Sequence, residues 1–215
     1  MNDTYRHKGL RRKLIAQLRD KGIADERILT AMDTLPRHFF LEKAFEEMAY
    51  EDKAFPILKG QTISQPYTVA YQTQLLGVEA GQRILEIGTG SGYQAALLAM
   101  LGARVYSLER HENLYKNATL LLRQMNFVTV RTYLRDGYDG LLALAPFDRI
   151  LLTAGVAEMP QNLLDQLAVG GICVAPMGEK TQTMCRIKRT SETLFSTERL
   201  ADFRFVPFLK GIEKQ

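Results

Sequence analysis

Apolar residues near the start of the chain recur three and four positions apart, the spacing of one face of a helix. Two such sets precede Pro36, and they are Leu10, Leu14, Ile15 and Leu18, followed by Ile28, Leu29, Met32 and Leu35. Pro36 then ends the second helix, because proline does not fit a helix interior. Residues 4 to about 50 are therefore predicted to be helical.

The next segment predicts a loop and one further helix. Residues 51–65 carry Pro56 and Gly60, and we expect them to form the loop. Pro66 can open the helix, because the first helical position tolerates proline. The apolar side of this helix and the glycine near its end are given by Val69, Ala70, Leu75, Leu76 and Gly77.

From residue 83 the pattern changes to short apolar runs that alternate with helix-length stretches. The runs are 83–87, 104–108, 128–132, 149–152 and 172–175, and the stretches between them include 93–101 and 114–125. Strands separated in this way predict βαβ units and a parallel sheet. After Pro176 two strand-like pieces, 183–188 and 201–208, follow without a helix between them, which predicts an antiparallel edge.

The fold class is therefore α/β, with a mostly parallel, doubly wound sheet, an antiparallel C-terminal edge and an N-terminal helical segment. The chain has 215 residues, of which 46% are apolar and 24% charged, as in an ordinary globular protein. This length suits a single domain, 1–215, whose core needs neither disulfides nor a metal. Cys173 and Cys185 stand in apolar surroundings, and we expect reduced core thiols.

The N-terminus has no apolar run that would indicate a secretory signal. No stretch approaches the ~20 apolar residues of a membrane helix. We expect a cytoplasmic protein without a membrane partner.

The net charge of +4 is too small to indicate a nucleic-acid partner. Basic residues gather in the first predicted helix, at Arg6, Lys8, Arg11, Arg12 and Lys13. We interpret them as the solvated face of an amphipathic helix. A helix that contacts RNA or a membrane is the alternative.

A glycine-rich loop follows the first predicted core strand. Residues 84–87 run directly into Gly88-Thr89-Gly90-Ser91-Gly92 and then into a helix. Glycines allow a sharp turn and the close approach of a ligand, and at this place in a doubly wound sheet they indicate a nucleotide-type cofactor. Glu109 ends the next strand about 20 positions after Gly88, the separation at which an acid reaches a ribose hydroxyl.

The loop differs from the dinucleotide pattern G-x-G-x-x-G, because Gly92 comes one position early and Tyr93 stands where the third glycine should be. Glu86 precedes it and can favour the amino and sulfonium groups of S-adenosylmethionine. The resulting pattern E-x-G-x-G-x-G is similar to that of the Rossmann-like methyltransferases. S-adenosylmethionine is thus the predicted cofactor and S-adenosylhomocysteine the product. A nicotinamide enzyme and a turn without a ligand are the alternatives.

Residues 60–66, Gly-Gln-Thr-Ile-Ser-Gln-Pro, together with residues 84–93, closely resemble the protein-L-isoaspartate O-methyltransferases. Further matches are 146–150, 153–154, Pro160, 163–167, 170–171, Pro176, Gly178 and 204–207. The resemblance covers roughly residues 36–211. Its most specific part is the Thr-Ile-Ser-Gln-Pro segment, which generic methyltransferases lack.

The resemblance implies a Rossmann-like S-adenosylmethionine-dependent methyltransferase fold, divided into three parts. Residues 1–65 would form the N-terminal helical segment and substrate loop, 66–178 the cofactor-binding core and 179–215 the C-terminal strands. It also implies a substrate, the free α-carboxylate of an L-isoaspartyl residue in a damaged protein or peptide. The methyl ester would then cyclise to a succinimide, and hydrolysis would return some normal aspartate. We expect a monomer with no metal and no nucleic acid.

The implied chemistry needs no strong general base, because an α-carboxyl group with a pKa of ~3.5 is already an anion at neutral pH. None of His7, His38 and His111 lies in a matched motif. Methyl transfer needs alignment instead, which can contribute ~7–11 kcal/mol.

By the resemblance, Ser64 is the active-site residue. It stands before a helix whose free N–H groups favour an anion, and the alternative is that Ser64 only caps that helix. The expected substrate contacts are Ser64, Pro66 and Ala154. The expected cofactor contacts are Thr62, Ile63, Glu86, Gly88, Thr89, Gly90, Ser91, Gly92, Glu109, Arg110, Asp136, Gly137 and Thr153, with adenine at Asp136-Gly137 and the reacting methyl beside Thr153.

Some positions depart from the family pattern, and they are Leu58, Lys59, Arg135, Gly155, Leu209 and Lys210. They remove no catalytic group, and we expect them to alter peptide preference or affinity. Residues 153–156, Thr-Ala-Gly-Val, lack the Asn/Asp-Pro-Pro-aromatic motif of base and amine methylation. The alternative functions are a Rossmann-like methyltransferase that acts on a small carboxylate or RNA, and a non-catalytic binding module for damaged chains.

Overall fold

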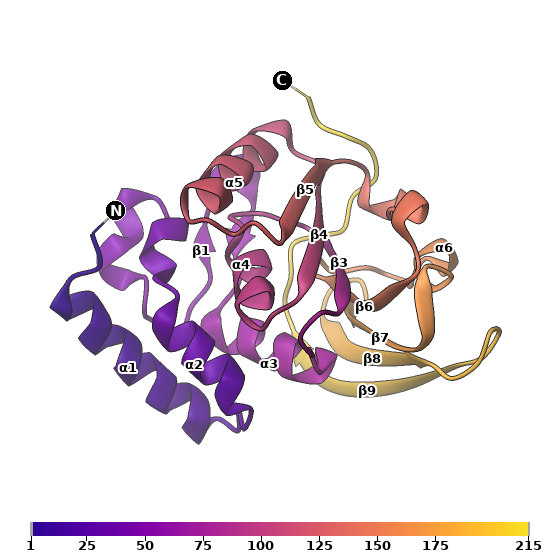
Figure 1. Ribbon diagram of the computed structural model, residues 1–215, viewed down its shortest axis with the longest axis horizontal. Coiled ribbons are helices and arrows are strands. Elements are labelled where there is room, and N and C mark those ends of the chain that lie inside the picture. The colour runs from indigo at the N-terminus through magenta and orange to yellow at the C-terminus, as the bar shows by residue number, and fades with distance from the viewer. Residues whose placement is uncertain (1, 215) are drawn as a thin grey trace.

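A seven-stranded sheet forms the centre of the computed structural model, which describes residues 2–214 (Figure 1). The strand order is β5-β4-β3-β6-β7-β8-β9. The first five strands of this order are parallel, and β8 and β9 are antiparallel to their neighbours. The bounds are β3 Arg83–Ile87, β4 Arg104–Glu109, β5 Val130–Leu134, β6 Phe147–Leu152, β7 Leu167–Met177, β8 Gln182–Arg189 and β9 Phe195–Phe203. The predicted α/β class with an antiparallel edge is confirmed.

Helices cover both faces of the sheet. The bounds are α1 Tyr5–Asp20, α2 Glu26–Thr34, α3 Pro66–Leu76, α4 Tyr93–Met100, α5 Glu112–Gln124 and α6 Gln161–Leu164. Side chains alternate along a strand, so Ile84 of β3 joins a core with α1 to α4, whereas Leu85 and Ile87 join a second core with α6. The first strand of the sheet along the chain is the central β3. From there the chain passes outward through β4 to β5, and then returns to β6 on the other side of β3. The order therefore reverses between β3 and β6, where doubly wound sheets bind ligands.

The predicted N-terminal helices are confirmed as α1 and α2, and α2 packs against α1, α3 and α4. After Pro36 the chain forms 3-10 turns instead, η1 Arg37–Phe40 and η2 Lys43–Met48. The prediction that Arg11 lies on a solvated basic face is wrong. It is buried, and its guanidinium donates to Asp3 at 3.0 and 3.1 Å and to the Tyr50 hydroxyl at 3.0 Å.

The predicted loop 51–65 contains two short paired strands, β1 Phe55–Pro56 and β2 Thr62–Ile63, joined through the turn η3 Leu58–Gly60. Two further 3-10 turns, η4 Gly137–Asp139 and η5 Leu142–Leu144, precede β6. No helix among residues 2–214 has the length and apolar character needed to cross a bilayer.

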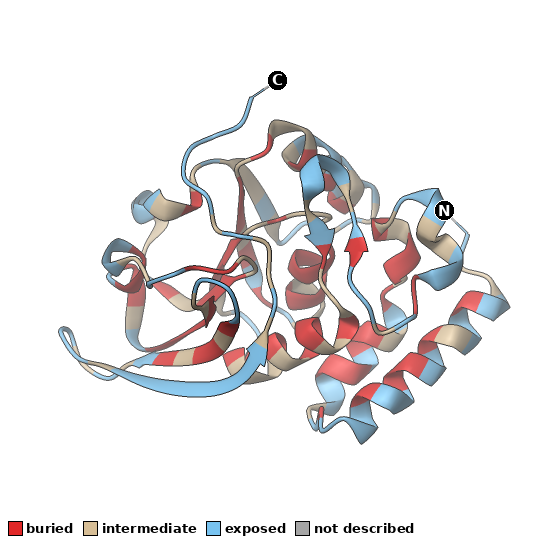
Figure 2. Cartoon of the chain, turned by 180° about the vertical axis from the view of Figure 1, so that it is seen from behind, coloured by how far each residue is buried: buried red, intermediate tan, exposed pale blue. Residues whose placement is uncertain are grey.

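Two predicted strands are displaced. The strand expected at 128–132 begins at Val130, because residues 125–129 form turns and Asn126 has a left-handed φ of 60°. The strand expected at 201–208 is β9, which ends at Phe203. Figure 2 shows β9 exposed along almost all of its length. Only Phe195 and Phe203, at its two ends, are partly buried, so most of β9 lacks the buried apolar positions that help to locate a strand from sequence.

Candidate active site

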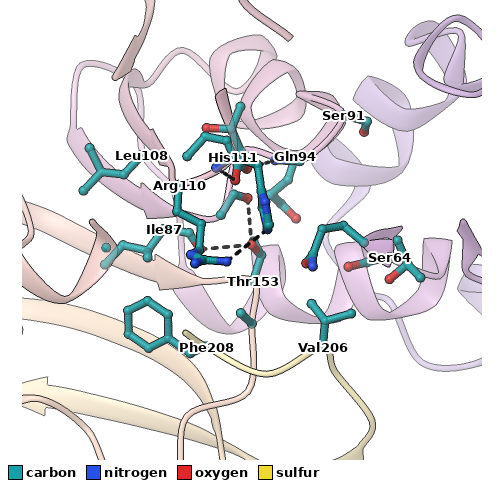
Figure 3. Close-up of a pocket in the computed structure, with 18 of the residues that line it drawn as sticks. Ser64, Ile87, Ser91, Gln94, Leu108, Arg110, His111, Thr153, Val206 and Phe208 are labelled. Carbon is teal, nitrogen blue, oxygen red and sulfur yellow. Dashed lines mark hydrogen bonds between the residues drawn. The ribbon is translucent and has the colours of Figure 1, made fainter. Parts of the chain in front are cut away.

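A cavity opens at the carboxyl ends of β3, β4 and β6 (Figure 3). Its walls come from segments that lie far apart in the chain, which are 61–64, 87–91, 93–94, 108–111, 153–154 and 206–209, together with Val69, Arg135 and Gly137. This is the reversal point of the strand order, where the sequence placed a cofactor.

The glycine loop is locked to the end of β6. Gly88 has a φ of +101°, a region that disfavours other residues, and a Cβ added there would lie 2.3 Å from Thr153 Oγ1. The Thr153 hydroxyl donates to the carbonyls of Ile87 at 3.0 Å and Gly88 at 2.7 Å. Only glycine fits this close approach, so Gly88 and Thr153 together set the position of the loop.

Glu109 joins the glycine loop to the end of β4. Its Oε2 accepts from the Gly90 N–H and its Oε1 from the His111 N–H, both at 2.9 Å. The side chain lies in the cavity wall. Each carboxylate oxygen can accept a second hydrogen bond, so Glu109 can also bind hydroxyl groups of a ligand.

Glu86 is fully buried beneath the loop and does not line the cavity. Ser107 Oγ donates to Glu86 Oε2 at 2.5 Å, and Ser107 lies 2.6 Å from Thr89 Oγ1. Glu86 Oε1 has no partner within the described chain. The pKa of Glu86 is raised to about 8, chiefly by burial and in part by the charge of Glu109, while the Ser107 hydrogen bond opposes the rise. Glu86 is therefore mostly protonated at neutral pH.

Gly137 and Asp136, predicted as a pair at the adenine position, face different ways. Gly137 lines the cavity, and a Cβ there would lie 2.5 Å from Ile87 Cγ2 and 2.7 Å from Phe208 Cε2. Asp136 does not line it. Its Oδ1 accepts from the Tyr138 N–H at 2.9 Å and its Oδ2 from the Gly211 N–H at 2.6 Å.

The C-terminal strap, residues 204–214, completes the wall and was not predicted to do so. It leaves the sheet after β9 and bonds to Gly155, whose N–H donates to the Val206 carbonyl at 2.8 Å and whose carbonyl accepts from the Phe208 N–H at 2.7 Å. The Phe208 ring stacks on Tyr138 with centroids 4.1 Å apart. Pro207 was the available signal, because proline cannot donate to a sheet ladder.

Near its end the strap is held by charge. The Glu213 carboxylate lies 3.5 Å from Lys59 Nζ, 3.5 Å from an Arg110 nitrogen and 3.2 Å from His111 Nδ1. Arg110 Nε also donates to the Gly211 carbonyl at 2.9 Å. The strap is thereby fastened to the end of β4.

A second cavity adjoins the first. The two share Thr62, Ser64, Thr153 and Val206. Phe203, Phe205, Asp202 and Arg204 contribute to the second alone, along with Ala54, Gln65, Thr68 and Thr181. In Figure 3, Ser64 lies at the opposite end of the first cavity from Leu108, Ile87 and Phe208. An elongated ligand in the first cavity can therefore meet a ligand in the second at Ser64.

The alternative in which Ser64 caps α3 is wrong. The N-cap residue is Gln65, and its side chain makes no capping hydrogen bond to the helix. The expected free N–H groups are also partly occupied, because the Tyr67 N–H donates to Asp52 Oδ1 at 2.8 Å. The protein itself thus supplies an anion at the start of α3.

The structure brings most of the predicted site residues together in the wall of the first cavity, which includes Thr62, Ile63, Ser64, Gly88, Thr89, Gly90, Ser91, Glu109, Arg110, Gly137, Thr153 and Ala154. Glu86, Gly92, Asp136 and Pro66 line neither cavity. Wall residues absent from the predicted set are Gln61, Val69, Ile87, Tyr93, Gln94, Leu108, His111, Arg135 and 206–209. Arg135 and Leu209, two departures from the family pattern, thus face the cavity.

Gly155, another position that departs from the family pattern, lies against the Gln182 side chain. A Cβ at this position would lie 2.9 Å from Cγ and Cδ of Gln182. The Gln182 side chain therefore occupies the space that an alanine at 155 would need.

Comparison with known proteins agrees with this geometry. Residues 9–213 match the family model "Protein-L-isoaspartate(D-aspartate) O-methyltransferase (PCMT)". Proteins named protein-L-isoaspartate O-methyltransferase from Cytophaga hutchinsonii and Flavobacterium psychrophilum are 52% and 51% identical. The alignments cover 97% and 98% of this chain and 95% and 99% of those proteins.

Solved structures give the same result. A protein-L-isoaspartate O-methyltransferase superposes with a TM-score of 0.84 at 29% identity, over 92% of this chain and 65% of that chain. A protein described as a putative member from Plasmodium falciparum, in complex with S-adenosyl-L-homocysteine, superposes with a TM-score of 0.82 at 25% identity, over 94% and 99%. The predicted methyltransferase fold is confirmed.

Proposed function

The chain belongs to the protein-L-isoaspartate(D-aspartate) O-methyltransferase family, and from this premise we propose its reaction. It transfers a methyl group from S-adenosylmethionine to the free α-carboxylate of L-isoaspartyl residues in damaged proteins and peptides. The observation that carries the proposal is the junction of two cavities at Ser64. One cavity has the features of a cofactor site, and the other can admit a peptide.

S-adenosylmethionine, when bound, supplies a methyl group on a positively charged sulfur. The first cavity suits it, because Glu109 can accept hydroxyl groups and the glycine loop lets a ligand approach its backbone. The unpartnered Glu86 Oε1 beneath the loop is a further buried polar atom. We assign direct contacts to the predicted residues that line the cavity, and support of the loop to Glu86, Gly92 and Asp136.

The residues at the junction have separate tasks. Thr153 uses its hydroxyl to hold the carbonyls of Ile87 and Gly88, so it fixes the loop. Ser64 lies in the walls of both cavities and donates a hydrogen bond to the substrate carboxylate. Since that carboxylate is already ionised, orientation and partial removal of water replace general base catalysis. Ala154, in the same wall, contacts the substrate.

In this proposal the enzyme releases the methyl ester and S-adenosylhomocysteine, and the later steps of repair need no enzyme. The neighbouring backbone nitrogen attacks the ester carbonyl, and methoxide leaves as methanol with the proton of that nitrogen, whereas a free carboxylate has no comparable leaving group. The succinimide therefore closes without further help, and its hydrolysis returns part of the chain to normal aspartate. The enzyme acts as a monomer in the cytoplasm, without nucleic acid or membrane. The buried, unpaired Cys173 and Cys185 support a reducing compartment.

The experiment is methyl transfer from radiolabelled S-adenosylmethionine to an isoaspartyl peptide and to its aspartyl twin. The proposal expects label in the isoaspartyl peptide alone. Label in RNA or in a small carboxylic acid, with neither peptide labelled, would contradict the substrate assignment.

A further inference from the structure

Asp52 binds Gln65, the residue that follows Ser64, and Tyr67 in the first turn of α3. Its Oδ1 accepts from the Tyr67 N–H at 2.8 Å, and its Oδ2 accepts from Gln65 Nε2 at 3.0 Å. Lys21 Nζ lies 2.6 Å from the same Oδ2. The Asp52 side chain is 9% exposed, and it lines neither cavity. Asp52 therefore acts on the segment that carries Ser64 from behind.

The start of α3 needs such a partner. The first N–H groups of a helix have no acceptor within the helix, and the N-cap residue Gln65 makes no side-chain cap. A carboxylate at this end also interacts favourably with the helix dipole. Asp52 supplies both the acceptor and the charge from a separate loop.

The other end of α3 is held by charged side chains in the same way. Arg149 donates to the carbonyls of Leu76 at 2.7 Å and Gly77 at 3.0 Å. Arg186 Nε donates to the Leu75 carbonyl at 3.1 Å. Two arginines of the sheet thus hold the end of α3, and Asp52 holds its start from the N-terminal loop.

The loop that carries Asp52 is itself anchored in the core. Arg37 is 1% exposed, and its guanidinium donates to the carbonyls of Ala49 at 3.0 Å and Lys53 at 3.5 Å. These two carbonyls flank Asp52 in the chain. The N-terminal layer thereby determines where the Asp52 carboxylate lies.

We propose that Asp52 is a positioning residue for methyl transfer, which holds Gln65 and the first turn of α3 so that Ser64 stays at the junction of the two cavities. The inference rests on the proposed function, in which Ser64 meets the substrate carboxylate. Lys21 balances the charge of Asp52, so the arriving carboxylate does not face an uncompensated anion. Asp52 touches neither substrate nor cofactor in this proposal.

The test compares Asp52→Ala and Asp52→Asn with the matched control Glu51→Ala. Asparagine can still accept from the Tyr67 N–H, but it has no charge for Lys21. Glu51 is the neighbouring acid, and its carboxylate is paired with Lys53 at 2.9 Å on the surface. We expect Asp52→Ala to lower kcat roughly tenfold to a hundredfold, the range expected when a reacting group is misplaced by about 1 Å. Asp52→Asn should fall in between, and Glu51→Ala should match the unaltered protein.

Two further measurements separate positioning from general damage to the fold. All assays are run at a temperature at which circular dichroism shows every variant folded, and S-adenosylhomocysteine affinity is measured by calorimetry. The proposal expects unchanged affinity in Asp52→Ala. A kcat equal to that of the unaltered protein, or a loss of affinity as large as the loss of kcat, would overturn it.

Amide hydrogen exchange over residues 62–70 provides a readout that does not depend on activity. Asp52→Ala should speed exchange at Tyr67, and Glu51→Ala should not. If the unaltered protein fails to methylate the isoaspartyl peptide, the proposed function fails. The exchange comparison still decides whether Asp52 holds this segment, and unchanged exchange at Tyr67 would overturn the inference.

Discussion

The two sides of the site are built in different ways. The cofactor side consists of strand ends and the glycine loop, fixed by close backbone packing such as that of Gly88 on Thr153. The substrate side consists of loops that single side chains such as Asp52 fasten to distant elements. The C-terminal strap, which Glu213 fastens in the same way, borders both sides. A substitution in the glycine loop should therefore act through steric fit, whereas a substitution at Asp52, Glu109 or Glu213 should act through loss of a polar contact.

Gly88→Ala should have the largest effect. The added Cβ would overlap Thr153 Oγ1, and the backbone conformation would be strained by ~1–3 kcal/mol. We expect S-adenosylhomocysteine binding to be lost in a calorimetric titration and Tm to fall. The control is Gly22→Ala, where φ is +94° but nothing lies within 4 Å of the added Cβ. It should lower Tm without changing affinity, and equal binding losses in both variants would contradict the steric explanation.

The buried Glu86 should make stability depend on pH. Its pKa is about 8 in the folded chain against an ordinary value of 4.5, so between these two pH values the folded state holds a proton that the unfolded state has released. Stability from this group is complete below pH 4.5 and is lost as the pH rises to about 8. Glu86→Gln should flatten this decline, by a few kcal/mol. Urea unfolding at several pH values tests this, and parallel curves for the two proteins would contradict it.

Ser64→Ala tests the substrate side. A hydrogen bond to a charged group contributes ~1.5–3 kcal/mol, so turnover should fall roughly tenfold to a hundredfold. Affinity for S-adenosylhomocysteine should change little, since the donated bond goes to the substrate. Steady-state kinetics and calorimetry measure the two effects. Retained turnover with a tenfold or larger loss of affinity would refute the assigned role.

Glu109→Gln tests the cofactor side, and we expect it to weaken cofactor binding less than Gly88→Ala does. The glutamine Nε2 cannot accept from the Gly90 or His111 N–H as Glu109 does. Loss of an acceptor for these groups and for ligand hydroxyls should weaken S-adenosylhomocysteine binding by ~2 kcal/mol, or roughly thirtyfold. Unchanged affinity in calorimetry would count against the ribose assignment.

The smallest effect is expected at the strap. Glu213→Gln removes the charge that faces Lys59, Arg110 and His111. Exposed ion pairs contribute ~0–1 kcal/mol, so cofactor dissociation should accelerate by about fivefold at most. Stopped-flow measurement at low and high salt tests this, since salt should reduce the difference between variant and unaltered protein.

The same contrast explains how much the sequence could predict. Strand β3 and the glycine loop follow from a short apolar run and a glycine spacing, both of which are local, and the structure reproduces them. Asp52 and Asp136 act on residues far along the chain, as in the bond from the Gly211 N–H to Asp136. No local pattern indicates such contacts.

For Glu86, the sequence indicates that the residue belongs to the site, but it does not indicate the direction of the side chain. Side chains alternate along a strand, so Glu86 points to the same side of β3 as Ile84 and away from Ile87, which lines the cavity. The pattern E-x-G-x-G-x-G gives the spacing of the acid. It does not say whether the acid faces the ligand or lies beneath the loop.

The most direct test of the central claim is a crystal structure with S-adenosylhomocysteine and an isoaspartyl peptide bound together. The proposed arrangement predicts the cofactor product in the first cavity, the peptide in the second, and the Ser64 hydroxyl within ~3 Å of the isoaspartyl α-carboxylate. A product bound outside the first cavity, or a carboxylate beyond hydrogen-bond reach of Ser64, would contradict it.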